Sequence, residues 1–181
     1  MAANNGIVMQ MIINKKLRDL PRLGFFSVTS IITDWGERQL TDFMNQSLIT
    51  YRLYRGLNVV GGYHYTTEIR ATAGLQYILA EKDWLVILYP RVDLSTDSNF
   101  ETFISAEYTP KINNTFSLYT RLQGLYTLRM NNGDHQRSYI WARVGLGYSD
   151  YTFGIGGNID YFGPDKKRVI NIGFFGSVDL Y

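Results

Sequence analysis

The two histidines of the chain are the side chains best suited to proton transfer near neutral pH. His135 directly follows Asp134 in the polar stretch Asn131–His135, and Asp97 lies in another polar stretch. An imidazole with a carboxylate partner is used in general-base catalysis, so these residues suggest a hydrolytic site as one hypothesis. The same stretch is rich in turn-forming Asn, Gly and Asp, and its ordinary interpretation is a polar loop without catalysis.

His64 is the second candidate base. Its neighbours Tyr63, Tyr65 and Thr66 include no serine that it would activate as a nucleophile. The sequence therefore favours a hydrogen-bonding role for His64. We expect no catalytic residues, and we keep the Asp/His site at His135 as the alternative.

Composition excludes several other kinds of site. The chain has no cysteine, which excludes disulfides and thiolate metal sites. Its formal net charge of +2 gives no argument for nucleic-acid binding. The Gly-Ile-Gly-Gly run at 154–157 lies inside a strand pattern and not before a helix, so it is not a phosphate-binding loop. We expect no metal, no cofactor and no nucleic-acid partner.

The elements that must position these residues are short strands in which one face carries no charge. An uncharged face turned outward, with arginines and carboxylates turned inward, is typical of a barrel in lipid, because Arg or Lys facing mid-bilayer costs about 2–4 kcal/mol. Each segment is close to the roughly 9–11 residues that cross a bilayer at a tilt. The ten segments are Leu23–Thr33, Gln46–Tyr54, Leu57–Thr66, Arg70–Ala80, Trp84–Leu94, Asn99–Thr109, Thr115–Arg129, Ser138–Ser149, Tyr151–Phe162 and Arg168–Tyr181.

The connections between these segments alternate between long and short. Asp34–Asn45 and Met130–Arg137 are long, whereas Arg55-Gly56 and Glu81–Asp83 are tight. Outer-membrane barrels have this asymmetry, with short turns at one end and longer loops at the other. An even number of strands places both termini on the short-turn side.

We therefore predict one all-β fold, a transmembrane antiparallel up-and-down β-barrel of about ten strands over residues 22–181. Residues 1–21 are expected to be a peripheral segment or strap. If Ile7–Ile13 is a strand, then the count becomes twelve, or a partner supplies the missing edge, because lipid does not tolerate an open sheet edge.

Aromatic residues gather at the ends of the predicted strands. Rings of this kind prefer the headgroup layer of a bilayer, which predicts an aromatic girdle. Ordinary β-propensity also enriches tyrosine and is the competing interpretation. The residues expected in the turn-side girdle are Tyr54, Trp84, Tyr108, Phe116, Tyr148 and Tyr151.

The inward faces carry a nearly balanced set of charges in which every base is an arginine. This composition is compatible with a narrow interior crosslinked by ion pairs, and also with a small aqueous pore. Tyr119, Tyr139 and Trp141 also point inward and would add bulk. The residues predicted to line the lumen are Arg52, Arg70, Arg91, Asp93, Glu101, Glu107, Arg121, Arg129, Arg143 and Asp160.

In its alternating faces, its aromatic ends and its final strand ending at Tyr181, the chain resembles a bacterial outer-membrane β-barrel over about residues 23–181. The stretch Tyr119–Tyr126 is similar to outer-membrane proteins of Bacteroidetes-type bacteria. The resemblance is one of architecture and names no functional family. It implies a Gram-negative outer membrane as location, with the lipid bilayer and small solutes as partners. The chain carries no signal peptide, so we expect a mature or trimmed form.

The expected function is a narrow porin-like channel, or a structural or binding barrel, with a charged, arginine-rich lumen. Ten strands with an Asp-His pair at the external mouth are similar to the omptin proteases, a resemblance that rests on the strand count and on Asp134 and His135 alone. It implies the alternative function, an outer-membrane protease or lipid hydrolase with an Asp/His site at the barrel mouth.

Overall fold

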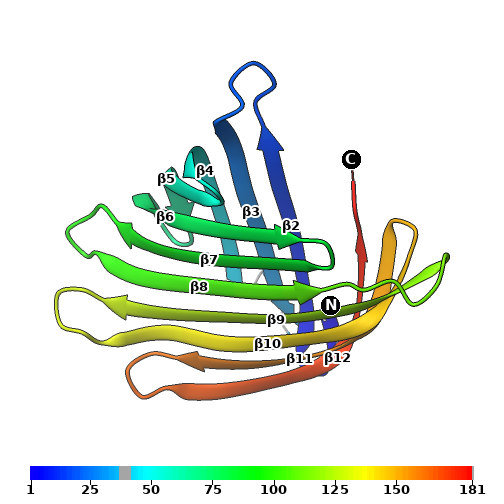
Figure 1. Ribbon diagram of the computed structural model, residues 1–181. Helices are drawn as coiled ribbons and strands as arrows, with labels where there is room; N and C mark the ends of the chain where they lie inside the picture. The colour runs from blue at the N-terminus through cyan, green and yellow to red at the C-terminus, as the bar shows by residue number, and fades with distance from the viewer. Residues whose placement is uncertain (37–41, 181) are drawn as a thin grey trace.

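Alternating side chains and tight turns fold the chain into a closed antiparallel β-barrel, shown in Figure 1. This computed structural model describes residues 1–36 and 42–180. Each strand pairs with its neighbours in the chain, and β1 pairs with β12 to close the wall. The strands are β1 (Ala2–Ala3), β2 (Gly6–Lys16), β3 (Leu23–Asp34), β4 (Asp42–Tyr54), β5 (Leu57–Tyr65), β6 (Ile69–Glu81), β7 (Trp84–Asp93), β8 (Asn99–Tyr108), β9 (Phe116–Arg129), β10 (His135–Tyr148), β11 (Tyr151–Phe162) and β12 (Lys167–Val178).

The tight turns are built from residues with positive φ. Arg55 and Gly56, with φ of 24° and 84°, join β4 to β5. A Cβ on Gly56 would lie 2.2 Å from the carbonyl oxygen of Ile78, so only glycine fits there. Lys82 and Ser149 also have positive φ, in the turns that precede β7 and β11. Tight turns of this kind set the register of the hairpins that they join.

The wall contains twelve strands, the alternative count, and not the ten that we expected first. The two additional strands are β1 and β2, both at the N-terminus, and β2 pairs with β3 from Gly6 to Lys16. The expectation of a peripheral segment at residues 1–21 therefore differs from the structure. The reason is local, because β2 has apolar residues on both faces and lacks the alternation that marks the other strands. Residues 37–41, which fall within the predicted long connection Asp34–Asn45, and Tyr181 lie outside the described residues.

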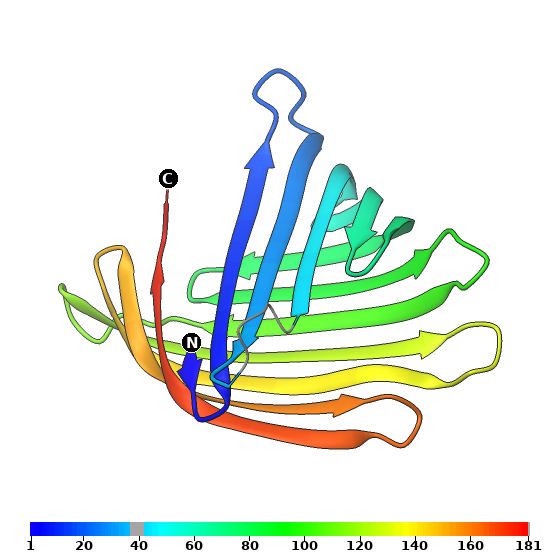
Figure 2. The same cartoon turned by 180° about the vertical axis from the view of Figure 1, so that it is seen from behind.

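The wall closes between β12 and β2 through β1 alone. Ala2 and Ala3 pair with Phe174 and Gly173 of β12, and Ala2 pairs with Ile7 of β2. Beyond this short contact, no described residue of β2 pairs with β12. Figures 1 and 2 show β12 diverging from β2 toward the C-terminus. This seam has the fewest inter-strand hydrogen bonds of the described wall.

The backbone amides of β2 that face this seam are expected to exchange hydrogen faster than those that face β3. The amide of Val8 donates to the carbonyl oxygen of Met1 (2.8 Å), so the amides of Gln10 and Ile12 point the same way and have no described strand partner. Residue-resolved hydrogen exchange in detergent micelles should find Met9 and Met11 better protected than Gln10 and Ile12. Equal protection at all four amides would contradict this prediction.

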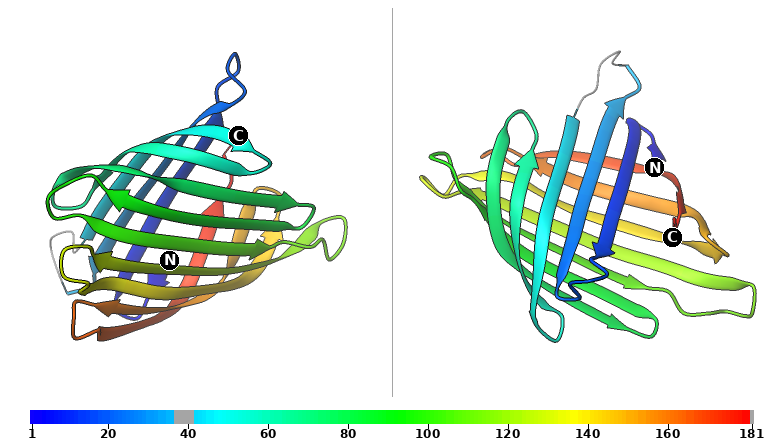
Figure 3. Two further views of the ribbon diagram at one scale, coloured as in Figure 1. Left: turned by 60° about the vertical axis from the view of Figure 1, so that its left-hand side comes forward. Right: turned by 90° about the horizontal axis from the view of Figure 1, so that it is seen from above.

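The two faces of the wall have opposite character. On the outside of β12, Ile172 and Phe174 are 68% and 75% exposed, whereas Asn158 and Asp160 on the inner face of β11 are 2% and 5% exposed. Figure 3 shows the tilted strands curving round to form the wall of the barrel. An apolar outer surface with a polar interior is the arrangement expected of a barrel in lipid.

Candidate functional site in the barrel lumen

Two cavities lie inside the barrel, one toward each end. The larger, of about 870 Å³, is lined by residues of the tight turns, among them Lys82 and Ser149, and we call it the turn-side chamber. The smaller, of about 200 Å³, is lined by Asp42 and Asn99 beside the long loops, and we call it the loop-side chamber. Trp141 and Gln10 line both chambers. A thin layer of side chains at this level of the lumen therefore separates them.

Aromatic rings held by hydrogen bonds make up this layer. Tyr139 and Trp141 stack with ring centroids 4.4 Å apart, and both are buried. The side-chain amide of Gln123 donates to the Tyr139 hydroxyl (2.7 Å), and Trp141 Nε1 donates to Asp160 Oδ2 (3.1 Å). Because each ring is fixed by both a stack and a hydrogen bond, the layer forms a defined constriction.

Apolar side chains fill the part of the lumen enclosed by β3 to β8. The side-chain amide of Gln46 on β4 donates to the hydroxyl of Tyr89 on β7 (3.4 Å), with β5 and β6 between them in the wall. This contact ties the filled part together across the interior. The buried members are Leu48, Val60 and Tyr89, and Phe26, Ile87 and Phe103 pack on them.

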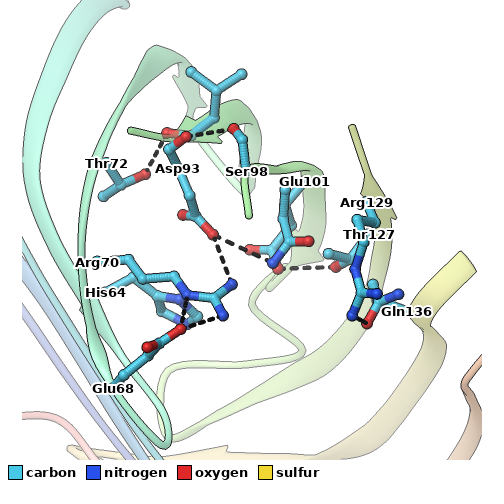
Figure 4. A network of polar contacts seen from close by, with 12 residues as sticks. His64, Glu68, Arg70, Thr72, Asp93, Ser98, Glu101, Thr127, Arg129 and Gln136 are labelled. Carbon is cyan, nitrogen blue, oxygen red and sulfur yellow. Dashed lines mark hydrogen bonds and ion pairs between the residues drawn. The ribbon is translucent and has the colours of Figure 1, made fainter. Parts of the chain in front are cut away.

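A network of charged groups lines the loop-side chamber, and Figure 4 labels several residues around its centre, among them His64, Arg70, Asp93, Glu101 and Thr127. At its centre is Arg91, only 2% exposed, whose Nε donates to Glu101 Oε1 (2.8 Å) and whose Nη1 donates to Asp93 Oδ1 (2.5 Å). The Thr127 hydroxyl donates to the second oxygen of Glu101 (2.9 Å). Such a buried ion cluster is tolerated only where its members are paired and hydrogen-bonded, as they are here.

His64 belongs to the same network. Arg91 Nη2 lies 3.2 Å from His64 Nδ1. A guanidinium has only donors, so Nδ1 must be the acceptor, and the ring proton is assigned to Nε2. His64 therefore accepts a hydrogen bond in the lumen, and the structure pairs it with no described serine.

A second arginine bridges the lumen from wall to wall. Arg137 on β10 contacts Asp160 on β11 (3.1 Å) and Asp42 on β4 (3.3 Å). In the closed order of strands β10 and β4 lie on opposite sides of the barrel. The Arg137–Asp42 contact therefore crosses the loop-side chamber and narrows it.

The turn-side chamber holds the remaining interior arginines. Arg121 Nε lies 3.4 Å from Glu107 Oε1. Arg143 donates to the side-chain oxygen of Asn158 (2.7 Å) and lies over the ring of Trp141, with Cζ 5.7 Å from the ring centroid. No carboxylate among the described residues lies within ion-pair distance of Arg143. Its charge is therefore met by neutral oxygens and an aromatic face.

Gly156 makes room for Arg143, and this gives a test of how tightly the interior is packed. A Cβ at Gly156 would lie 2.5 Å from Arg143 Cδ, whereas a Cβ at Gly157 would meet nothing closer than 3.8 Å. We expect Gly156→Ala to lower the free energy of unfolding in detergent by about 1–3 kcal/mol through overpacking. The matched variant Gly157→Ala should change it by less than about 0.5 kcal/mol. If guanidinium titrations give the same free energy of unfolding for Gly156→Ala and Gly157→Ala, the side chain of Arg143 is not tightly packed against Gly156.

The structure places eight of the ten residues predicted to line the lumen in the interior and two at its ends. Arg52 is exposed and donates to the carbonyl oxygen of Pro21 (3.1 Å) beside a tight turn. Arg129 donates to Gln136 Oε1 (3.4 Å) near a long loop. The interior residues are Arg70, Arg91, Asp93, Glu101, Glu107, Arg121, Arg143 and Asp160.

Sequence reasoning missed three interior residues of the site. Tyr89 precedes Arg91 by two positions and shares its face, so strand alternation alone would have found it. Gln10 lies on β2, which carried no clear alternation. Arg137 was assigned to a loop, although it lies within β10 next to a register shift in the pairing with β9.

The hypothetical Asp/His pair at the mouth is not formed. The backbone amide of Asp134 donates to Asn132 Oδ1 (3.0 Å), and Asn132 Nδ2 donates to Asp134 Oδ2 (2.5 Å), as in a polar turn. His135 is bonded elsewhere, to Gly163 and Ser138. Asp134 therefore has no part in orienting this imidazole. Within residues 1–36 and 42–180, no group of three or more His, Asp or Glu is placed to hold a metal ion.

The predicted turn-side girdle residues lie at the turn ends of their strands. The rings of Trp84 and Tyr108 stack at 4.5 Å, and those of Phe116 and Tyr148 are 5.5 Å apart. Tyr54 and Tyr151 are 64% and 51% exposed. This placement is the one that a ring at a headgroup layer requires.

The closed antiparallel wall, apolar outside and polar inside, has the fold of a bacterial outer-membrane β-barrel. Among solved structures the chain is similar to the NanC porin, with a TM-score of 0.58 and 14% sequence identity over 98% of each chain. No protein-family model matches the sequence, and no curated protein matches it either. No helix among the described residues is long and apolar enough to cross a membrane.

Proposed function

We propose that this protein is a narrow channel of the bacterial outer membrane that passes ions or small polar solutes through its lumen. The observation that carries the proposal is the pair of chambers that reach from opposite ends to one aromatic layer at Trp141. The larger chamber offers about 870 Å³ of space lined by polar and charged side chains such as Glu107, Arg121 and Arg143, which is room for water and small polar solutes. The fold shared with a porin supports the same function.

Two levels of the lumen would limit passage. One is the Arg137–Asp42 contact across the loop-side chamber, and the other is the stack of Tyr139 on Trp141. The charged residues around Arg91 line the loop-side chamber, where the first constriction lies. Arg121 and Arg143 line the turn-side chamber. Their mixed charges would set ion selectivity at close range. The aromatic ends of the strands would hold the barrel at the headgroup layers.

The test is single-channel recording of the refolded protein in a planar bilayer, after circular dichroism has confirmed β-structure. We expect discrete, small conductance steps whose reversal potential in a salt gradient reports the charge selectivity. The Arg137→Gln variant should conduct more than the wild type, because the link to Asp42 across the mouth is weakened. Folded, inserted protein that never conducts would contradict the channel.

A further inference from the structure

A serine and a histidine meet on the outer face of the barrel at the end that carries the long loops. His135 Nδ1 lies 2.7 Å from the carbonyl oxygen of Gly163, and His135 Nε2 lies 2.9 Å from the hydroxyl oxygen of Ser138. A carbonyl oxygen only accepts hydrogen bonds, so the ring proton is on Nδ1. The lone pair of Nε2 is therefore free to accept the proton of the Ser138 hydroxyl.

The sequence alone would separate these two side chains, and a break in strand register brings them together. Residues three apart in a regular strand point to opposite faces. The pairing of β10 with β9 shifts between His135 and Arg137, which inserts one extra residue. Because of this irregularity, His135 and Ser138 share one face, whereas Arg137 follows the regular alternation of Tyr139 and Trp141 and points into the lumen.

That face is the outer one, on which Ser138 is half-buried and His135 is 5% exposed. Ser138 pairs with Tyr126 and Tyr161 on the flanking strands, and Tyr126 is 43% exposed. Ile140, the next residue on the same face, is 56% exposed. Neither His135 nor Ser138 lines either chamber, so the proposed channel makes no use of them.

We propose that Ser138 and His135 are the nucleophile and base of a site that hydrolyses carboxylic esters of amphipathic molecules at the membrane surface. Three features of the geometry support it: the fixed tautomer, the serine-to-imidazole hydrogen bond and the position on the apolar wall near its loop end. Ester groups of lipids lie at the boundary between headgroups and acyl chains, the depth expected for a residue just below the loops. The proposal shares with the channel only the placement in a bilayer.

The reaction has two balanced halves. The Ser138 hydroxyl oxygen attacks the ester carbonyl carbon, its proton passes to His135 Nε2, and the carbon–oxygen bond to the alcohol breaks as the imidazolium returns that proton to the leaving oxygen. Water then attacks the acyl-serine, gives one proton to Nε2 and releases the carboxylic acid as Ser138 recovers its hydrogen. The Gly163 carbonyl stabilises the imidazolium through Nδ1. The phenols of Tyr126 and Tyr161, on the strands beside Ser138, are donors of the type that stabilise a developing oxyanion.

The experiment uses the refolded chain in detergent with a fluorophosphonate probe and, separately, p-nitrophenyl butyrate. We expect the probe to label Ser138, as located by mass spectrometry. Ser138→Ala and His135→Ala should each abolish labelling and lower ester turnover by about 100-fold or more. The exposed loop variant Ser95→Ala serves as the matched control and should behave as wild type.

Loss of folding is separable from loss of the site. Ser138 faces outward, so Ser138→Ala should keep wild-type circular dichroism and wild-type conductance steps. Folded wild-type protein that is not labelled and hydrolyses the ester no faster than Ser138→Ala would overturn the site and leave the channel untouched. Labelling that persists in folded Ser138→Ala would also overturn it.

Discussion

Replacing Trp141 by alanine should raise the single-channel conductance by a factor of about two or more, because a constriction of a narrow pore sets its resistance. Trp141 and Gln10 line both chambers, so removal of the indole should widen the layer between the spaces of about 870 Å³ and about 200 Å³. It also frees Tyr139 from its stacking partner. Single-channel recording in a planar bilayer measures the effect directly.

Trp84→Ala is the matched control for this variant. Trp84 has the same side chain, lies at a tight turn and is 49% exposed, stacked on Tyr108. Trp84 lines the turn-side chamber at its outer end and not at the aromatic layer. Its removal deletes an equal volume without widening that layer, so the conductance should stay at the wild-type value. An unchanged conductance in Trp141→Ala would place the limiting level elsewhere, with the Arg137–Asp42 contact as the next to test.

Arg91→Met should destabilise the barrel by about 3–5 kcal/mol, because it leaves buried carboxylates without their counter-charge. Arg91 and Asp93 are each 2% exposed, and Glu101 is also enclosed by the wall. Methionine keeps much of the length of the side chain, so the loss comes mainly from the charge. Guanidinium unfolding in detergent, followed by tryptophan fluorescence, gives the difference in free energy.

Two further variants separate charge from packing. Arg70→Met removes an arginine that pairs with largely exposed Glu68 and, at 3.8 Å, with buried Asp93. Asp93 keeps Arg91 as its close counter-charge, so this variant should lower the free energy of unfolding by only about 0–1 kcal/mol. Adding Asp93→Asn and Glu101→Gln to Arg91→Met should recover part of the lost stability, because neutral amides cost less to bury than unpaired carboxylates. If Arg70→Met and Arg91→Met lower the free energy of unfolding by the same amount, the network around Arg91 has no special role in stability.

Local alternation was sufficient to place most strands and their faces. The residues Arg91 and Asp93 were assigned to the interior because their neighbours in the strand are apolar, and both are buried. The same rule failed for β2, where Val8 and Ile12 face the lumen and Met9 and Met11 face outward, so no contrast between the faces exists. The strand count then depended on which segment pairs with the free edge of β3, a question that local pattern does not answer.

The sequence by itself determined that this is an antiparallel barrel with an uncharged exterior and an arginine-rich interior, because both properties follow from alternation within single strands. Only the tertiary structure decided what the interior does. The contact of Arg137 with Asp42 joins residues 95 positions apart on opposite walls, and Trp141 meets both chambers only because the wall closes. The pairing of His135 with Ser138 likewise required a break in register. Contacts across a lumen depend on closure and register, which are properties of the whole sheet and leave no signal in any one strand.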